Sequence, residues 1–429
     1  MRLAWNALLL WGCCGSLPAF ASPASIFNDA DQVYRMHYAT SLVMSAAVPE
    51  SQYLLMAIKH NSFLIGDLAY IREPENGNAM GSPLRLDGDV KIDHVEKQAD
   101  GSSEVFYSYD GEVVLNRKGM THYLLYLPND YESLTKLGSR ELGVCSVYKT
   151  ANSIPTLDLL APYWNPFINP RHCRIPYHEV QADLAAVPLK TTYPDYPRLV
   201  KNGEIPISIF MGKMQARDPN APVTSVFGSP MSSAIQEYRT LTKGLRRLGF
   251  VRTQVIRDRH DRANYQEFYS LSTSRAKIRI HLVYGDSVFQ GPTMNEFNSL
   301  YVKAAQEDSA VFYSGHSGFL VDASGLNLYP DMQIRFDPDR YQIFSLNGCQ
   351  TNYYLYPIYQ RKGTKNLDVF LNALETYSNV DGTLKPIEAI VGWAQEGRWT
   401  SYPDLVREVD TVNGMMGVVG EQDNPTTPY

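Results

Sequence analysis

Residues 310–318 read AVFYSGHSG, and residues 341–351 read YQIFSLNGCQT. Each stretch opens with a short apolar run, which is typical of a strand buried on both faces. Each run then passes into small polar residues and glycine, which permit tight turns. In open parallel sheets, functional groups gather beyond the carboxyl ends of the strands. We therefore predict that His316 and Cys349 lie at the ends of two neighbouring strands of an α/β domain.

The pattern on both sides of these stretches supports a parallel sheet. Strand and helix signals alternate, which predicts a mostly parallel sheet with helices on both faces. Clean alternation in residues 277–282 indicates an edge or hairpin strand. A capping box at residues 233–236 and a stop at Gly249 bound one helix. Strands are predicted at residues 206–212, 252–257, 277–282 and 389–393, and helices at residues 235–248, at residues 295–306 and, with interruptions, from Asn352 past Leu371.

The preceding region of the chain has a different character. A helix-like stretch is followed by β patterns, and Tyr109-Asp110-Gly111-Glu112 is a hairpin turn signal. Residues 153–196 are rich in Pro, Tyr and Asn and predict an irregular connection. We expect a smaller β-containing domain over residues 22–200, the α/β domain over residues 201–400 and a tail over residues 401–429. The helix is expected at residues 29–47 and the strands at residues 90–95, 104–109, 112–115 and 121–127.

The N-terminus has the features of an export signal. Arg2 precedes a mostly apolar stretch, and Ala19-Phe20-Ala21 fits a cleavage site, so residues 1–21 are predicted to be a signal peptide. Lipoprotein processing at Cys13 is the alternative, although Trp11 suits it poorly. No later stretch reaches 18 apolar residues, so we expect no stable membrane span. The predicted location is the periplasm, the cell surface or the extracellular space.

The remaining cysteines predict one disulfide and one free thiol. After signal removal Cys145, Cys173 and Cys349 remain, and in an oxidising compartment two of them are expected to pair. Cys145 and Cys173 lie in the same loop-rich stretch and are the natural pair. A metal site with His172 and His178 is the alternative, but the spacing fits no standard zinc pattern. We predict no metal and no cofactor, and Cys349 remains unpaired.

Composition and motifs exclude several classes of function. The net charge is −6 and the pI is about 5.9, which argues against nucleic acid as the main partner. A phosphate-cradling glycine loop, a G-x-S-x-G elbow and an H-E-x-x-H motif are all missing from the sequence. Kinase, serine hydrolase and zinc peptidase functions are therefore disfavoured. The oligomeric state is left open.

Cys349 and His316 together are suited to acyl transfer. A cysteine nucleophile reacts as its thiolate, and a nearby histidine can accept the thiol proton. A helix start at Thr351 or Asn352 is expected to lower the pKa of the thiol. Backbone N–H groups of the glycine-rich turns are candidates to bind the oxyanion of a tetrahedral intermediate. Taken alone, each residue also fits a structural role as a buried small side chain or a hydrogen-bonded core histidine.

These motifs resemble those of the caspase-like superfamily of cysteine peptidases, which includes caspases, metacaspases, gingipains, legumains and separases. Tyr313-Ser314-Gly315-His316 is similar to the metacaspase histidine motif, and residues 344–351 resemble the cysteine strand of bacterial caspase-like domains. The resemblance covers residues 203–395. It implies Cys349 as nucleophile and His316 as the proton-holding histidine.

The same resemblance implies further roles in the site. Ser317 stands where the family usually has glycine, and its N–H, with Gly318 and Gly348, would support the oxyanion. By analogy, residues 393–399 would line the pocket for the P1 side chain. The predicted function is that of an exported cysteine endopeptidase acting on a protein or peptide. A catalytically inactive caspase-like binding or scaffold protein is the alternative, which the Ser317 departure favours.

Overall fold

The chain forms two compact units in the computed structural model: unit 1 comprises Met1–Asn28 and Leu189–Tyr429, and unit 2 comprises Asp29–Pro188. The boundary after Pro188 differs from the one expected near residue 200. The predicted signal peptide and Cys13 lie outside the described residues. The structure describes residues 25–84, 90–129, 134, 136–137, 139–147, 160–212, 233–257, 265–285, 296–315, 334–363, 365–376, 379–411, 414–420 and 424–429.

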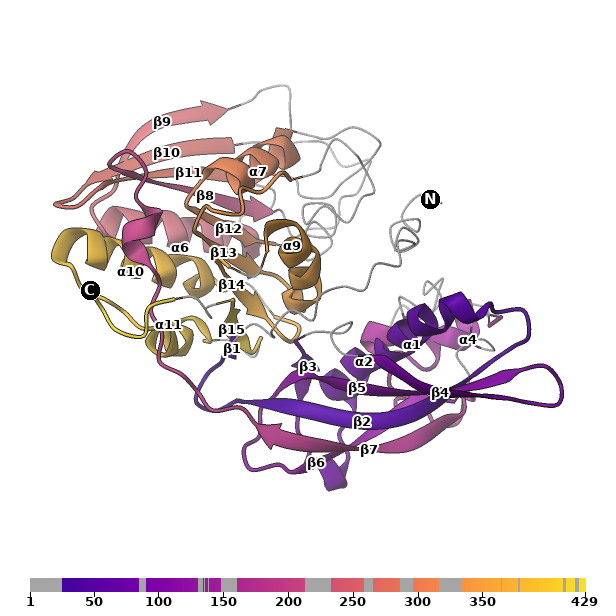
Figure 1. The fold of residues 1–429 in the computed structure, drawn as a ribbon. Helices are drawn as coiled ribbons and strands as arrows, with labels where there is room; N and C mark the ends of the chain where they lie inside the picture. The colour runs from indigo at the N-terminus through magenta and orange to yellow at the C-terminus, as the bar shows by residue number, and fades with distance from the viewer. Residues whose placement is uncertain are drawn as a thin grey trace. The chain divides into compact units, whose positions relative to one another are not determined.

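Unit 1 is built on a nine-stranded mixed sheet with helices on both faces (Figure 1). The strand order is β1-β15-β14-β13-β12-β8-β11-β10-β9. Only the five central strands, from β14 to β11, are parallel, because antiparallel strands extend the sheet at each side. The α/β layering is confirmed, whereas the sheet is less parallel than the sequence predicted. The strands are β1 Ser25–Ile26, β8 Glu204–Gly212, β9 Val251–Arg257, β10 Tyr265–Ser272, β11 Lys277–Gly285, β12 Ala310–Ser314, β13 Gln342–Asn347, β14 Leu367–Asn372 and β15 Met416–Val419.

Helices cover both faces of the unit 1 sheet, and the side chains of each strand point alternately to one face and to the other. In β8, Ile207 and Ile209 belong to the core shared with α6, α10 and α11, whereas Phe210 faces the other way and contacts Phe297 of α7. Helix α9 lies on the same side as α7 (Figure 1). The helices are α6 Ser233–Arg247, α7 Glu296–Glu307, α9 Leu355–Lys362, α10 Asp381–Glu396 and α11 Tyr402–Val409, with short 3-10 helices η5 Tyr196–Leu199 and η7 Thr351–Tyr354.

Several predicted elements of unit 1 are confirmed, and others are wrong. Strands β8, β9, β12 and β13 and helices α6 and α7 lie where the sequence predicted them. Residues 389–393 are part of helix α10 and not a strand, because a short apolar run fits a buried helix equally well. The helix expected to pass Leu371 ends at Lys362 and is followed by β14. Residues 401–429 are not a separate tail, because they contribute α11 and β15 to unit 1.

Strand β11 forms a hairpin with β10, as its alternation indicated, but it is not an edge strand. Its other side pairs in parallel with β8. The exposed Lys277 and Arg279 suggested an edge, yet both lie beside Glu204 at the start of β8. Opposite charges across neighbouring strands therefore account for the polar pattern of a strand inside the sheet.

Unit 2 is an antiparallel sheet of six strands covered by helices α1 and α2 (Figure 1). The strand order is β3-β5-β2-β7-β6, and β4 pairs with a further stretch of β5. The core lies between the helices and one face of the sheet. The elements are β2 Gln32–Met44, α1 Tyr53–Asn61, α2 Phe63–Tyr70, β3 Gly81–Pro83, β4 Lys91–Lys97, β5 Ser103–Leu115, β6 His122–Pro128, α4 Ser139–Gly143 and β7 Tyr177–Ala186, with 3-10 helices η1 Glu50–Gln52, η2 Pro74–Asn76 and η4 Ala161–Tyr163.

The helix predicted at residues 29–47 is wrong, because most of this stretch is strand β2. Tyr34, Met36 and Tyr38 are buried while Arg35 and His37 between them are exposed, which is the period of a strand. The irregular connection expected over residues 153–196 likewise contains strand β7. The partners of β2 and β7 are strands distant in the sequence, so the local sequence does not reveal the pairing that makes these stretches strands.

The hairpin turn predicted at residues 109–112 is also wrong, because β5 runs straight through it. Asp110 pairs with His37 in the ladder with β2, and its carboxylate accepts a 2.9 Å hydrogen bond from Arg35. A side chain on Gly111 would place its Cβ 2.2 Å from the hydroxyl oxygen of Tyr109. Glycine is therefore required here by close packing and not by a turn.

A buried histidine makes the stability of unit 2 sensitive to acid. His60 is fully buried; its Nε2 lies 2.6 Å from the Pro128 carbonyl and its Nδ1 lies 2.7 Å from the Tyr107 hydroxyl. Neutral imidazole satisfies both partners by donating to the carbonyl and accepting from the hydroxyl. Burial, which outweighs the Pro128 bond, lowers the pKa of His60 to about 4.

We expect unit 2 to lose stability as the pH falls through this range. The lowered pKa of His60 means that its contribution is complete above about pH 6.5 and is lost as the pH falls toward 4, by about 2–3 kcal/mol at pH 4.5. The raised pKa of buried Asp67 acts in the opposite direction. Urea denaturation at several pH values should show a smaller acid loss for His60→Gln than for the unchanged protein. Equal pH profiles would contradict the assignment to His60.

Within the described residues, no helix is long and apolar enough to cross a membrane.

Candidate functional site

The carboxyl ends of β8, β12, β13 and β14 meet at one edge of the unit 1 sheet. The chain passes from β8 to β11 on one side and then returns to β12 on the other side, so the strand order reverses between β8 and β12. Ser314, the last residue of β12, pairs with Met211 of β8 and with Asn347, the last residue of β13. In open α/β sheets, ligands bind beyond the strand ends at such a reversal point.

Cys349 lies two residues beyond the end of β13 at this edge. It is the free cysteine of the described residues, and its side chain is half-buried. Its thiol donates a 3.5 Å hydrogen bond to the Thr376 carbonyl. The prediction that Cys349 is unpaired and lies just beyond a strand end is therefore confirmed.

The protonation of Cys349 differs from the sequence expectation. Burial raises the pKa of the thiol, a main-chain hydrogen bond with Thr376 acts in the opposite direction, and the nearby Glu375 carboxylate raises it further. The helix that follows is the single 3-10 turn η7. Its N-terminus does not offset the loss of hydration, so the described surroundings of Cys349 favour the neutral thiol.

His316, Ser317 and Gly318 lie outside the described residues, which end at Gly315 on this side. The Gly315 N–H donates to the Asn347 carbonyl at 3.1 Å. A Cβ on Gly315 would lie 3.3 Å from the Cα of Gly212, so the ends of β8 and β12 approach closely here. The last described residue before His316 therefore lies directly beside the strand that leads to Cys349.

A buried polar network fixes the turn that carries Cys349. The Asn347 side chain donates to the Asn379 carbonyl at 2.5 Å. The Asn372 side chain donates to the Asn347 side-chain oxygen at 3.2 Å and to the Gly348 carbonyl at 3.1 Å. The Thr351 hydroxyl donates to the Leu346 carbonyl and accepts from the Asn372 N–H. Hydrogen bonds that are fully buried rigidify the main chain on which they converge.

The two residues that flank Cys349 have their main-chain N–H groups engaged. The Gly348 N–H donates to the Leu346 carbonyl at 3.2 Å. The Gln350 N–H donates to the Leu374 carbonyl at 3.0 Å, and Gln350 adopts a left-handed φ of 47°. The Gly348 N–H thus already has an acceptor in this arrangement, and its predicted role in oxyanion support stays a prediction.

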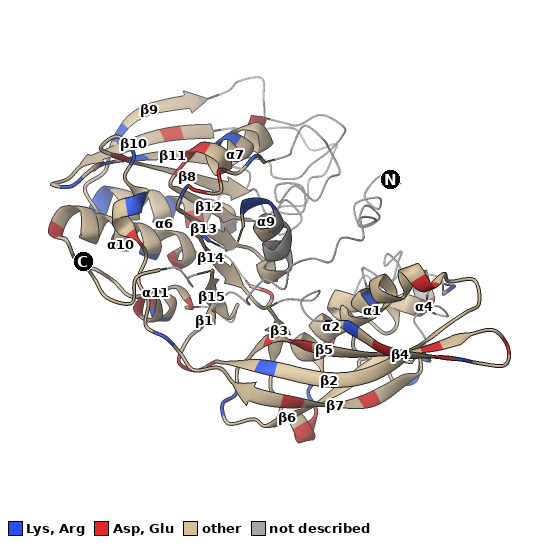
Figure 2. Cartoon of the chain, viewed as in Figure 1, with Lys and Arg blue, Asp and Glu red and all other residues tan. Residues whose placement is uncertain are grey.

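Glu237 is a residue of this edge that the sequence did not reveal. It lies in the first turns of α6, is nearly fully buried and accepts a 2.6 Å hydrogen bond from the Ser314 hydroxyl. Strands β12 and β13 carry no Lys, Arg, Asp or Glu, and both are tan in Figure 2. Carboxylates at this edge thus come from helices and loops, where no sequence motif marks them.

Residues 393–399, expected near the site, lie at the opposite edge of the sheet. The Trp393 ring stacks on Tyr196, which precedes β8, with the centroids 5.8 Å apart. Arg275, in the turn before β11, donates from its main chain to the Ala394 carbonyl at 3.2 Å. Both contacts are with residues that precede parallel strands, so the expectation of a P1 pocket here is wrong.

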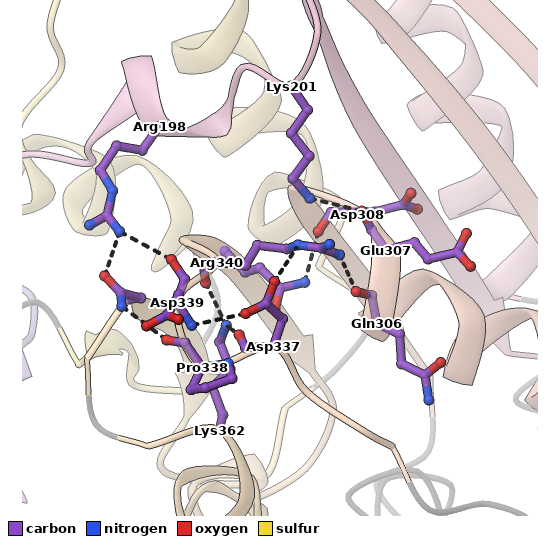
Figure 3. Close-up of polar contacts among 12 residues, drawn as sticks. Arg198, Lys201, Gln306, Glu307, Asp308, Asp337, Pro338, Asp339, Arg340 and Lys362 are labelled. Atoms are coloured by element: carbon purple, nitrogen blue, oxygen red, sulfur yellow. Dashed lines mark hydrogen bonds and ion pairs between the residues drawn. The ribbon is translucent and has the colours of Figure 1, made fainter.

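Charged side chains gather at this same opposite edge, where the parallel strands begin (Figure 3). Lys201 and Arg340 donate to main-chain carbonyls in the last turn of α7. Lys362 donates to the carbonyls of Asp337 and Arg340. Burial lowers the pKa of Lys201 and that of Lys362 to about 8. These cations hold a helix end and a loop, which explains their burial without a ligand.

The expected disulfide between Cys145 and Cys173 is present in unit 2. His172 and His178, the metal alternative, have other partners: His172 contacts Asn169, and His178 lies 2.6 Å from the Thr40 hydroxyl. No group of three or more His, Cys, Asp or Glu suited to a metal occurs among the residues that the structure describes. Cys145 and Cys173 therefore act as a covalent link within unit 2.

Comparisons with protein-family models, with curated proteins and with solved structures gave no match to this chain. The function must therefore be inferred from the geometry of the site and from the residues that form it.

Proposed function

We propose that the protein is an exported cysteine endopeptidase with a caspase-like catalytic domain in unit 1. The observation that carries this proposal is the register of two strand ends. Ser314 of β12 lies beside Asn347 of β13, His316 follows the first by two residues, and Cys349 follows the second by two residues. Neighbouring strands thus end side by side two residues before His316 and two residues before Cys349, which supports pairing of the two side chains.

The proposed chemistry assigns one role to each residue. His316 accepts the thiol proton of Cys349, and the sulfur attacks the carbonyl carbon of the scissile peptide bond. The tetrahedral intermediate collapses to a thioester, and the amine departs with the proton returned by His316. Water then hydrolyses the thioester. Because burial raises the pKa of Cys349, the resting thiol needs such a base.

Two features of the chain support substrate binding near Cys349 and export of the protein. The switch in strand order between β8 and β12 creates a binding position at the edge where Cys349 lies. The disulfide between Cys145 and Cys173 is typical of proteins that fold in oxidising compartments, which agrees with an N-terminal export signal. Unit 2 would then serve as a prodomain or as a substrate-docking module.

Alkylation of Cys349 tests the proposal. The folded protein is treated with low iodoacetamide at pH 6–7, and labelling is located by mass spectrometry. We expect fast labelling of Cys349, because His316 accepts the thiol proton as the sulfur attacks, and we expect the labelling to disappear in His316→Ala. An isolated thiol with a raised pKa reacts only as the pH rises toward alkaline values. Slow labelling that is identical in both proteins would exclude the dyad.

An inactive binding or scaffold protein is the second candidate, and one observation favours it. The Cys349 thiol has a raised pKa and donates to the Thr376 carbonyl, as a structural cysteine does. For a scaffold we expect labelling that rises only at alkaline pH and does not depend on His316. The same alkylation experiment therefore distinguishes the two candidates.

A further inference from the structure

The side-chain amide of Gln350 is a buried donor without an acceptor in the part of the chain that the structure describes. Gln350 directly follows Cys349, and its side chain is only 9% exposed. Its Nε2 is fully buried and has no hydrogen-bond partner among the residues that the structure describes. Leaving a buried N–H group unpaired is costly, so such groups are rare in native proteins.

The main chain of Gln350 is also held in a costly conformation. Its φ of 47° lies in the left-handed region, which residues other than glycine seldom adopt. The conformation is held by the bond from the Gln350 N–H to the Leu374 carbonyl and by the polar network under Gly348. Residues in such conformations cluster at sites where strain serves a function.

The reaction proposed for Cys349 requires a hydrogen-bond donor for the oxyanion, and the main-chain N–H groups of the two flanking residues are already engaged. A tetrahedral intermediate places negative charge on the former carbonyl oxygen, and Glu375 nearby adds unfavourable negative charge. The N–H groups of Gly348 and Gln350 already donate to Leu346 and Leu374. Within the described chain, the one unpaired donor on the residues that flank Cys349 is Gln350 Nε2.

We propose that the Gln350 side chain is an oxyanion donor of the Cys349 site. This inference rests on the proposed function. The carboxamide N–H would hydrogen-bond the carbonyl oxygen of the scissile bond as that oxygen becomes negative, which lowers the barrier to attack by sulfur. Because Gln350 would touch the reacting atoms, it is a catalytic residue and not merely a support for the turn.

Two reagents separate oxyanion stabilisation from thiol reactivity. Iodoacetamide reacts by displacement: a sulfur–carbon bond forms, iodide leaves, and no carbonyl oxygen gains charge. p-Nitrophenyl acetate reacts by acyl transfer: a sulfur–carbonyl bond forms through an oxyanion, p-nitrophenolate leaves, and the thiol proton passes to a base. Only the second reaction should depend on a donor at Gln350.

The test compares both reactions in the full chain and in three variants of Gln350. Methionine keeps the length of the side chain without a donor. Alanine and glycine both remove the donor, but glycine accepts the left-handed backbone that alanine strains. A Cys349→Ala protein gives the background of each reagent. Mass spectrometry measures the rates of acylation and alkylation of Cys349, and melting temperatures show whether each variant is folded.

We expect all three variants to acylate Cys349 about 10²–10³-fold more slowly than the unchanged protein, while their alkylation rates are unchanged. The melting temperature of Gln350→Gly should be no lower than that of Gln350→Ala, because glycine relieves the backbone strain. If Cys349 is nevertheless acylated no faster in Gln350→Gly, the loss of rate arises from the missing donor and not from strain. Variants that acylate at the normal rate, or that lose both reactions equally, would overturn the role of Gln350 alone. If the unchanged protein is not acylated at Cys349, the proposed function and this inference both fail.

Discussion

Replacing Asp368 by alanine is expected to destabilise unit 1 by about 3–5 kcal/mol, because it removes the acceptor shared by three buried donors. Asp368 lies on β14 and is fully buried. Its carboxylate accepts hydrogen bonds from the hydroxyls of Tyr341 and Tyr402 and a 2.7 Å bond from the Asn424 side chain. Burial and the neighbouring carboxylate raise the pKa of both tyrosines, so both remain donors at all ordinary pH values.

Guanidinium denaturation, followed by fluorescence, measures the loss. Asp368→Asn keeps an acceptor of the same shape and should lose less than Asp368→Ala. The matched control is Asp339→Ala, which removes an exposed carboxylate of the same unit and should change the free energy of unfolding by less than about 0.5 kcal/mol. Similar values for Asp368→Ala and the control would show that the three donors find other partners.

Removing the disulfide should destabilise unit 2 by about 3–4 kcal/mol. Cys145 and Cys173 are 28 residues apart in the sequence, and the bond restricts the unfolded chain over this interval. The double variant Cys145→Ala/Cys173→Ala avoids placing a new hydroxyl at Cys145, which is fully buried. The expected loss arises in the unfolded state, so the folded sheet of unit 2 should be unchanged.

Hydrogen exchange with peptide resolution is the suitable measurement for this variant. Peptides of β5, β6 and β7 should exchange faster in the double variant by the factor that corresponds to the lost free energy. Peptides of unit 1 serve as the internal control and should exchange at their original rates. A uniform change across both units would contradict an effect restricted to unit 2.

Sequence reasoning succeeded where one local pattern has one structural solution. The apolar runs at residues 206–212 and 310–313 lie in buried central strands, and the amphipathic pattern at residues 235–248 lies in α6. It failed where tertiary partners decide. The turn signal at residues 109–112 is overridden by the Arg35 contact and by the packing of Tyr109 on Gly111.

The error at residues 389–393 also misplaced the predicted P1 pocket. A parallel strand there would end at the edge that holds Cys349. Helix α10 instead runs from Gly382, whose carbonyl accepts from Ser345 near that edge, to Trp393 at the opposite edge. A mistake of element type therefore reversed the direction of the chain and moved the aromatic residues to the wrong end of the sheet.

The candidate site was predictable in position but not in its electrostatics. The glycine and small polar residues after β13 located Cys349 correctly. The pKa of its thiol depends on burial, on Thr376 and on Glu375, which come from a loop 26–27 residues further along the chain. The same limit applies to Gln350 and Glu237, because exposure and hydrogen-bond partners are properties of the assembled fold.

The insertion of unit 2 into unit 1 sets an order for folding during synthesis. All of unit 2 has been made once Pro188 emerges, and its two ends are already joined by the hydrogen bond from the Val187 N–H to the Val33 carbonyl. The sheet of unit 1 is complete only when Ile26 pairs with Val418 of β15, the strand of this sheet that is synthesised last among those described. An early-folding insert shortens the loop that this late pairing must close, which lowers its entropic cost. A ribosome-bound chain stopped before β15 should therefore hold a native unit 2 and an incomplete unit 1.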